Sequence, residues 1–187
     1  MKSVSQQSLI NQLTEKVEQH MALVSKVYQN LDSQTLSTPS NTGGWSIAQC
    51  FAHLNSYGDY YLPQIQKHLI KNQAQATDHL FKSTWLGNYF TQLMLPGEKM
   101  KKMKTFKAHV PIAQPDGHAA VAEFLHQQET LLQLLKQSKE KNLNAIRIPI
   151  SISTIIRLKL GDVFGFIIAH NERHLAQAER NLATTAT

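Results

Sequence analysis

Apolar residues recur at steps of three and four through the N-terminal part of the chain. The series comprises Leu9, Leu13, Val17, Met21, Val24, Tyr28 and Leu31. This spacing places every member on one face of a helix, so it predicts one long amphipathic helix from about Ser5 to Leu31. Segment 32–44, rich in Ser, Thr, Pro and Gly, is expected to be a loop.

A second apolar stripe follows the glycine pair at 43–44. Its members are Ile47, Cys50, Leu54, Tyr57, Tyr61 and Ile65. Ser46 is a good N-cap and Gln49 follows it by three residues, which is the capping-box signature. The stripe predicts a helix from Ser46 to about Lys71. A kink is expected at Pro63, because an interior proline removes a backbone hydrogen bond and clashes with the preceding turn.

The second half of the chain contains two more helical patterns. One predicts a helix from His118 to about Lys141, and the other a last helix from Gly161 or Asp162 to about Leu182. The inward positions of the first of these are Val121, Phe124, Leu125, Gln128, Leu131 and Leu135. Both stripes are wide enough to face the core of a small domain.

Two long connections separate these helices. Segment 72–117 is the least regular part, although 83–95 is expected to form a short helix. Segment 143–158 is rich in β-branched residues and contains Pro149, so we expect an extended crossing or a short strand-like piece. Four long amphipathic helices with long overhand connections predict an all-α four-helix bundle.

Composition narrows the class of protein. A chain of 187 residues with 42% hydrophobic and 17% charged residues can bury one good core, so residues 1–187 are expected to form a single domain. Cys50 is the only cysteine, which excludes an internal disulfide and a thiolate metal cluster. Its apolar neighbours indicate a small buried hydrophobe.

The N-terminal residues 1–7 are polar and lack the apolar core of a signal peptide. No stretch of the sequence has the length and apolarity of a membrane-spanning helix. We therefore expect a cytoplasmic soluble protein with no membrane partner.

The formal net charge of +6 raises the question of nucleic-acid binding. Much of the excess lies in one run, formed by Lys99, Lys101, Lys102, Lys104 and Lys107. Runs of this kind are usually a solvated face. Because no nucleic-acid recognition motif accompanies the charge, a nucleic-acid partner is not expected.

The chemistry of the chain centres on two histidines, His170 and His174. One helical turn separates them, so both imidazoles leave the same face of the last helix, together with Phe166 and Ile167. Two inward imidazoles make half of a metal site. With nine histidines, chance supplies such a pair in about one chain in three, so a third ligand is needed. His53, about two turns into the second helix, is the candidate.

Two motifs resemble those of a known family. The first, Trp-Ser-x-x-Gln-x-x-x-His-Leu, is formed by Trp45, Ser46, Gln49, His53 and Leu54. The second, His-x-x-Arg-His-x-x-Gln, is formed by His170, Arg173, His174 and Gln177. They resemble the second-helix and last-helix motifs of the DinB/YfiT-like proteins, and they occur in the expected order and at about the expected separation. The resemblance covers most of the chain and implies the same four-helix bundle.

The candidate metal ligands are His53, His170 and His174. Three neutral imidazoles suit zinc, nickel or another late divalent ion and leave at least one position for water. No carboxylate stands out as a fourth ligand. Glu172 should face away from the two flanking histidines, whereas Asp59 and Glu129 lie on helices from which they could reach the interior. No catalytic residue is assigned beyond the ligands.

Several neighbouring residues have two interpretations. Gln49 and Gln177 lie one turn from a candidate ligand, and they either orient it or make ordinary interhelical hydrogen bonds. Trp45 is expected to pack at the end of the bundle rather than to form a platform for substrate. The other histidines share no ligand spacing and are expected at the surface or in packing: His20, His68, His79, His109, His118 and His126.

The resemblance also implies function classes. The family includes metal-dependent hydrolases and transferases that use a low-molecular-weight thiol such as bacillithiol or mycothiol. We therefore expect a metal-dependent hydrolase or thiol S-transferase acting on a small molecule, with zinc or nickel and, for a transferase, the thiol as cofactors. The alternative is a non-catalytic, stress-associated bundle that binds a metal or a ligand. The sequence leaves a homodimer open.

Overall fold

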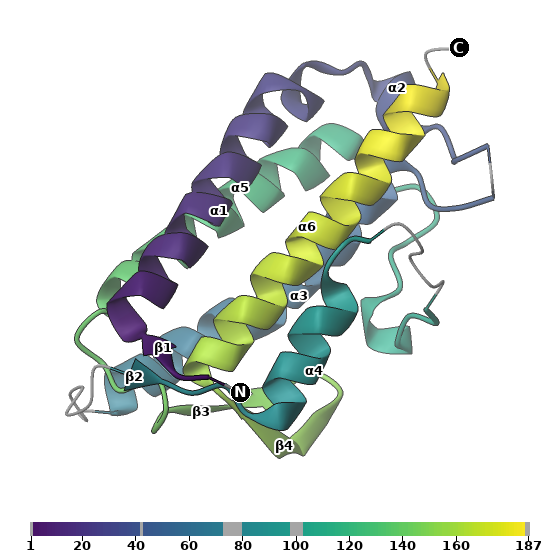
Figure 1. Ribbon diagram of the computed structural model, residues 1–187. Helices are drawn as coiled ribbons and strands as arrows, with labels where there is room; N and C mark the ends of the chain where they lie inside the picture. Colours follow the sequence, from purple (N-terminus) through teal and green to yellow (C-terminus); the bar gives the residue numbers. More distant parts are fainter. Residues whose placement is uncertain (1, 42, 73–79, 98–102, 186–187) are drawn as a thin grey trace.

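The computed structural model describes residues 2–41, 43–72, 80–97 and 103–185. Its four long helices are α1 (Gln6–Lys26), α3 (Ile47–Lys71), α5 (Gly117–Gln137) and α6 (Leu160–Thr185). They lie side by side along most of their length (Figure 1). The all-α four-helix bundle predicted from the sequence is confirmed.

The order of the helices around the bundle differs from their order in the chain. Helices α1 and α3 each pack against α5 and α6. Consecutive long helices α1 and α3 therefore lie across the bundle from each other, as do α5 and α6. A short loop cannot join helices placed in this way, which explains why the connections are long.

The segment predicted as a loop, 32–44, contains a short helix, α2 (Ser33–Ser37). The prediction of a loop is wrong there for two reasons. The Asp32 side chain caps the helix by accepting from the Thr35 backbone N–H at 2.8 Å, and Leu36 is fully buried and anchors the turn. Just before it, the last turn of the first predicted helix is a separate 3₁₀ turn, η1 (Tyr28–Asn30).

The capping box at the start of α3 is confirmed. The Ser46 hydroxyl accepts from the Gln49 backbone N–H at 3.1 Å, and the Gln49 Oε1 accepts from the Ser46 backbone N–H at 3.0 Å. Two backbone donors at the helix end are thereby satisfied. The helix continues through Pro63 to Lys71, and the kink stays a prediction.

The connection from α5 to α6 is a β-hairpin rather than one extended piece. Strands β3 (Arg147–Ile150) and β4 (Ser153–Lys159) are antiparallel, and Pro149 pairs with Arg157. The expectation of extended structure over 143–158 is thus correct, although the turn within it was not predicted. A second pair, β1 (Val4–Ser5) with β2 (Leu80–Phe81), was not predicted at all.

The predicted short helix over 83–95 is α4 (Trp85–Met94), which packs along α6 (Figure 1). Asp162 joins the two helices at their N-terminal ends. Its carboxylate accepts from the Thr84 backbone N–H at 3.1 Å, from the Thr84 hydroxyl at 2.7 Å and from the Ser83 hydroxyl at 2.5 Å. Gly87 permits this approach, because a Cβ there would lie 2.2 Å from the Asp162 Cγ.

Two clusters of buried apolar side chains fill the bundle. One surrounds Ile65, Leu135 and Phe164, and the other surrounds Phe51 and Phe124. Cys50 is buried in the second cluster, as predicted. Within the described ranges, no helix combines the length and apolarity that crossing a membrane requires.

Candidate metal centre

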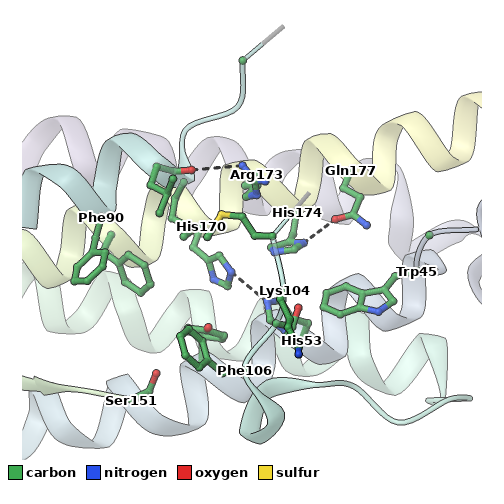
Figure 2. A pocket seen from close by; sticks show the side chains of 18 of the residues that line it. Trp45, His53, Phe90, Lys104, Phe106, Ser151, His170, Arg173, His174 and Gln177 are labelled. Carbon is green, nitrogen blue, oxygen red and sulfur yellow. Dashed lines mark hydrogen bonds between the residues drawn. The ribbon is translucent and has the colours of Figure 1, made fainter. Parts of the chain in front are cut away.

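The bundle brings the three predicted histidines together. His53 comes from α3, and His170 and His174 come from neighbouring turns of α6 (Figure 2). All three are buried, and their candidate ligand nitrogens lie within 4.8 Å of one another. The Nε2 atoms of His53 and His170 are 3.2 Å apart. Two nitrogens at 2.0–2.1 Å from a tetrahedral ion would be about 3.3 Å apart, so this spacing fits a metal ion.

A backbone carbonyl fixes the orientation of the His53 ring. The Nδ1–H of His53 donates to the carbonyl oxygen of His109 at 2.7 Å, which leaves the Nε2 lone pair facing the cluster. The His109 ring is itself fixed, since it stacks on Tyr57 at 3.9 Å between centroids and lies 3.0 Å from the Ser56 hydroxyl. Such partners set the tautomer and position of a ligating imidazole.

His109 was expected at the surface or in packing, and it is buried in packing against Tyr57. Its role as a partner of His53 was missed. The donor–acceptor contact is made by its main chain, and it lies in an irregular segment, η2 (Lys107–His109), without periodicity. No side-chain pattern in the sequence signals this contact.

Gln177 orients the second histidine of the α6 pair. The Nδ1–H of His174 donates to the Gln177 Oε1 at 3.0 Å (Figure 2), which leaves its Nε2 available. Of the two interpretations given for this glutamine, the contact agrees with orientation of the candidate ligand His174. Gln49 differs, because its side chain caps α3 through Ser46 and lies 3.4 Å from the Ile112 carbonyl.

Burial keeps the three imidazoles neutral. It lowers the pKa of His53 to about 4 and that of His174 to about 3, and it lowers the pKa of His170 well below its usual value. Neighbouring histidines lower these pKa values further: His109 acts on His53, His53 acts on His174, and His174 and His53 act on His170. Neutral imidazole is the form that binds metals, so the electrostatics of the cluster suit a cation.

Aromatic rings enclose the cluster. The Trp45 ring centroid is 4.7 Å from that of His53 and 5.8 Å from that of His174. The Phe166 ring lies nearly parallel to that of His170, at 5.8 Å. Trp45 packs against the apolar cluster around Phe51, as predicted, but it also borders a cavity.

This cavity has a volume of about 1170 Å³, and the three histidines form part of its wall. Apolar and aromatic side chains form much of its wall: Tyr61, Phe90, Met94, Ile150, Leu158 and Phe166. Its charged wall residues are Lys104, Arg173 and Arg180, and the described part of the lining contains no carboxylate. The volume suits a small molecule.

None of the carboxylates considered from the sequence approaches the cluster. Glu172 points away, as expected, and pairs with Lys16 of α1 near His20. Asp59 and Glu129 are exposed. Among the described residues, therefore, the cluster consists of the three histidines.

The other sequence features lie apart from the site or outside the described residues. His20 is buried beside Glu172, His68 is bonded to the preceding turn, and His118 and His126 are exposed. His79 falls outside the described ranges, as do Lys99, Lys101 and Lys102 of the lysine run, whereas Lys104 and Lys107 are exposed.

The fold and the site define a class of protein: a helical bundle with a buried three-histidine cluster opening into a cavity. A profile of the DinB superfamily matches residues 16–178, so the chain belongs to the DinB superfamily. Comparison with curated proteins gives no match.

The chain is also similar in fold to YfiT from Bacillus subtilis, which is described as "a probable metal-dependent hydrolase with an unusual four-helix bundle topology". The two share 13% sequence identity, with a TM-score of 0.61. The alignment covers 95% of this chain and 87% of that chain.

Proposed function

We propose that the protein is a metal-dependent enzyme acting on a small molecule, with one zinc or nickel ion held by His53, His170 and His174. One observation carries the proposal: three buried, neutral imidazoles meet at one point in the wall of a cavity of about 1170 Å³. Membership of the DinB superfamily and the description of YfiT agree with it.

The residues around the histidine cluster contribute to the proposed site in different ways. His109 and Gln177 hold two of the imidazoles in the orientation that aims Nε2 at the ion. Trp45 packs against the rings of His53 and His174, and Phe166 packs against the ring of His170. When bound, the ion supplies Lewis acidity, which activates a water or thiol and polarises a substrate carbonyl.

The proposed reaction is hydrolysis or thiol transfer. Two observations favour a thiol S-transferase that uses a cofactor such as bacillithiol. The described cavity lining has no carboxylate to serve as a general base, and burial raises the pKa of Tyr57 to about 12. Thiol transfer makes a smaller demand on the protein, because the nucleophile is the sulfur of the cofactor.

Metal content tests the proposal directly. Protein purified without chelator or a metal-affinity tag should contain near one divalent ion per chain by elemental analysis. His170→Ala or His174→Ala should abolish binding, and His53→Ala should weaken it severely. His126→Ala, at an exposed position on α5, is the matched control and should leave the content unchanged. Full occupancy in the double variant His170→Ala/His174→Ala would contradict the assignment.

Two assays separate the candidate reactions. In the cobalt-substituted protein, a thiol entering the coordination sphere should perturb the visible spectrum, so titration with bacillithiol or cysteine tests thiol transfer. Conjugation of monochlorobimane should then require both metal and thiol and vanish in His174→Ala. Turnover of ester or amide substrates without any spectral response to thiols would favour the hydrolase. A stoichiometric ion with neither activity would favour the non-catalytic binding protein.

A further inference from the structure

Helices α4 and α6 run in the same direction along one side of the cavity. Asp162 of α6 binds the N-terminal end of α4, the ring of Phe166 contacts that of Phe90, and Arg173 donates to the Leu93 carbonyl at 3.5 Å. These contacts follow one another in the same order along both helices. Both Phe90 and Leu93 line the cavity, so α4 forms a wall beside the helix that carries two of the histidines.

The ring of Phe166 connects this wall to the histidine cluster. It is nearly parallel to the ring of His170, with an interplanar angle of 6° and 5.8 Å between centroids. It also meets the rings of Phe90 and Tyr61 in edge-on geometry, at 6.3 Å and 5.9 Å. Because Phe166 precedes His170 by one helical turn, a group against its ring lies about 6 Å along the helix from the imidazole.

The β-hairpin supplies another part of the wall. Ile150 of β3, Leu158 of β4 and Ile152 in the turn between the strands line the cavity. The hairpin is held against α3, since the Tyr61 hydroxyl accepts from the Ser151 backbone N–H at 3.1 Å. This backbone donor is therefore satisfied within the protein and needs no partner from a ligand.

The side chains that meet here are apolar, and together they form what we call the apolar subsite: Phe90, Ile150, Ile152, Leu158 and Phe166. In Figure 2, Phe90 lies on the side of His170 away from Trp45. Aliphatic and aromatic surfaces gain free energy when an apolar group displaces water from them. They offer no partner to a polar group, whose burial is then costly.

We propose that the apolar subsite binds an uncharged alkyl or aryl arm of the substrate and thereby places the reacting group at the histidine cluster. The substrate is then a small molecule with a hydrocarbon arm rather than a compact polar one such as a sugar. The position of the reacting group rests on the proposed metal-dependent function. Binding of the arm does not, because no side chain of the apolar subsite is a candidate ligand.

Binding of 1-alkanols to chelator-treated protein tests the apolar subsite without a metal. We expect affinity, measured by isothermal titration calorimetry from butanol to decanol, to rise about four-fold for each added methylene until the subsite is full. Diethylene glycol monomethyl ether has a chain of the same length as heptanol, with ether oxygens in place of methylenes. It should bind at least about ten-fold more weakly than heptanol, because its oxygens lose their water.

Variants assign this binding to the apolar subsite. Phe90 is half-buried, and Phe90→Ala should weaken heptanol binding by about ten-fold through loss of apolar contact. Ile152→Trp should fill part of the subsite, so that affinity stops rising at a shorter alkanol. Ile155→Ala, at an exposed position on β4 outside the cavity lining, is the matched control and should change neither result.

The outcomes separate this proposal from the metal proposal. A dependence on chain length that persists in His170→Ala/His174→Ala supports the apolar subsite even if the wild-type protein binds no metal. Stoichiometric metal without any dependence on chain length would overturn the substrate class alone. Equal binding of heptanol and the ether, absence of alkanol binding to the wild-type protein, or unaltered binding in both cavity variants would also overturn it.

Discussion

The imidazole of His53 is oriented by the main chain of His109, 56 residues further along the sequence, with 2.7 Å between Nδ1 and the carbonyl oxygen. The long connection between α3 and α5 therefore supports the histidine cluster through this contact with His53. The His109 ring stacks on Tyr57, and this contact helps to hold the residue and its carbonyl in place.

Removing the His109 side chain should loosen this contact while leaving the carbonyl in place. In His109→Ala, loss of the stack on Tyr57 frees the segment, so we expect metal affinity to fall by about ten-fold with helical content unchanged. Competition with a chromophoric chelator measures the affinity. His118→Ala, at an exposed position, should behave as wild type, and equal affinities of the two variants would contradict the role of His109.

Gln177 offers a cleaner test of orientation, because its hydrogen bond to His174 is made by the side chain. Gln177→Ala should lower metal affinity by about 10–100-fold. Gln177→Glu keeps an acceptor at the same place and should retain most of the affinity. Both variants are measured in the same chelator competition. If the glutamate variant were as weak as the alanine variant, the hydrogen bond would not be the cause.

Metal removal should lower the melting temperature without unfolding the chain. The long helices bury two apolar clusters that do not include the histidines, so the bundle keeps its core without the ion. Bound metal adds stability only through its preference for the folded state. Circular dichroism of chelated protein should show a helical spectrum with a cooperative transition at lower temperature. A random-coil spectrum would be the contrary result.

Acid should destabilise the metal-free protein. The pKa of His53 is about 4 in the folded state and about 6.5 in the unfolded chain. Between these values the unfolded state binds the additional proton, so stability is present above pH 6.5 and is lost as pH falls. At pH 5 the loss from His53 is about 2 kcal/mol. Urea midpoints at pH 7.5 and 5 measure it, and His53→Gln should show a smaller difference.

The close approach of α4 to α6 predicts an effect for a single methyl group. In Gly87→Ala the Cβ would meet the Asp162 carboxylate at 2.2 Å, so one helix must shift, at a cost of about 1–3 kcal/mol. Gly97→Ala is the control, because no atom of the described residues lies within 4 Å of a Cβ built there. Urea denaturation compares the two variants, and equal midpoints would show that α4 adjusts freely.

Periodicity was sufficient to locate the long helices, because each has an apolar stripe that the bundle buries. The inward direction of His170 and His174 was predicted from their spacing, since one turn separates them on an apolar face, but the pair alone did not identify a metal site. His53 required the motif around it, because it lies at the flank of its stripe. The metal assignment itself stays a prediction, as do the single domain over 1–187 and the cytoplasmic location.

Contacts made by the main chain or by close packing were not predictable. The contact at His109 is made by a main-chain carbonyl, which every residue type has, so the sequence does not indicate it. Strands β1 and β2 have two residues each, too few to show a pattern in the sequence. The N-terminal anchoring of α4 by Asp162 depends on a distance that only the fold sets. The approach of Arg173 and Arg180 to one cavity likewise depends on how the helices are arranged.

The long helices carry the histidines, and the connections carry much of the cavity wall. This separation has a consequence for how such proteins diverge. The three histidines belong to α3 and α6, whereas much of the facing wall comes from α4, Phe106 and the β-hairpin. Connections tolerate substitution and changes of length better than packed helices do. Related proteins can therefore come to bind different small molecules through substitutions in these connections, while the histidines and the helices that carry them are retained.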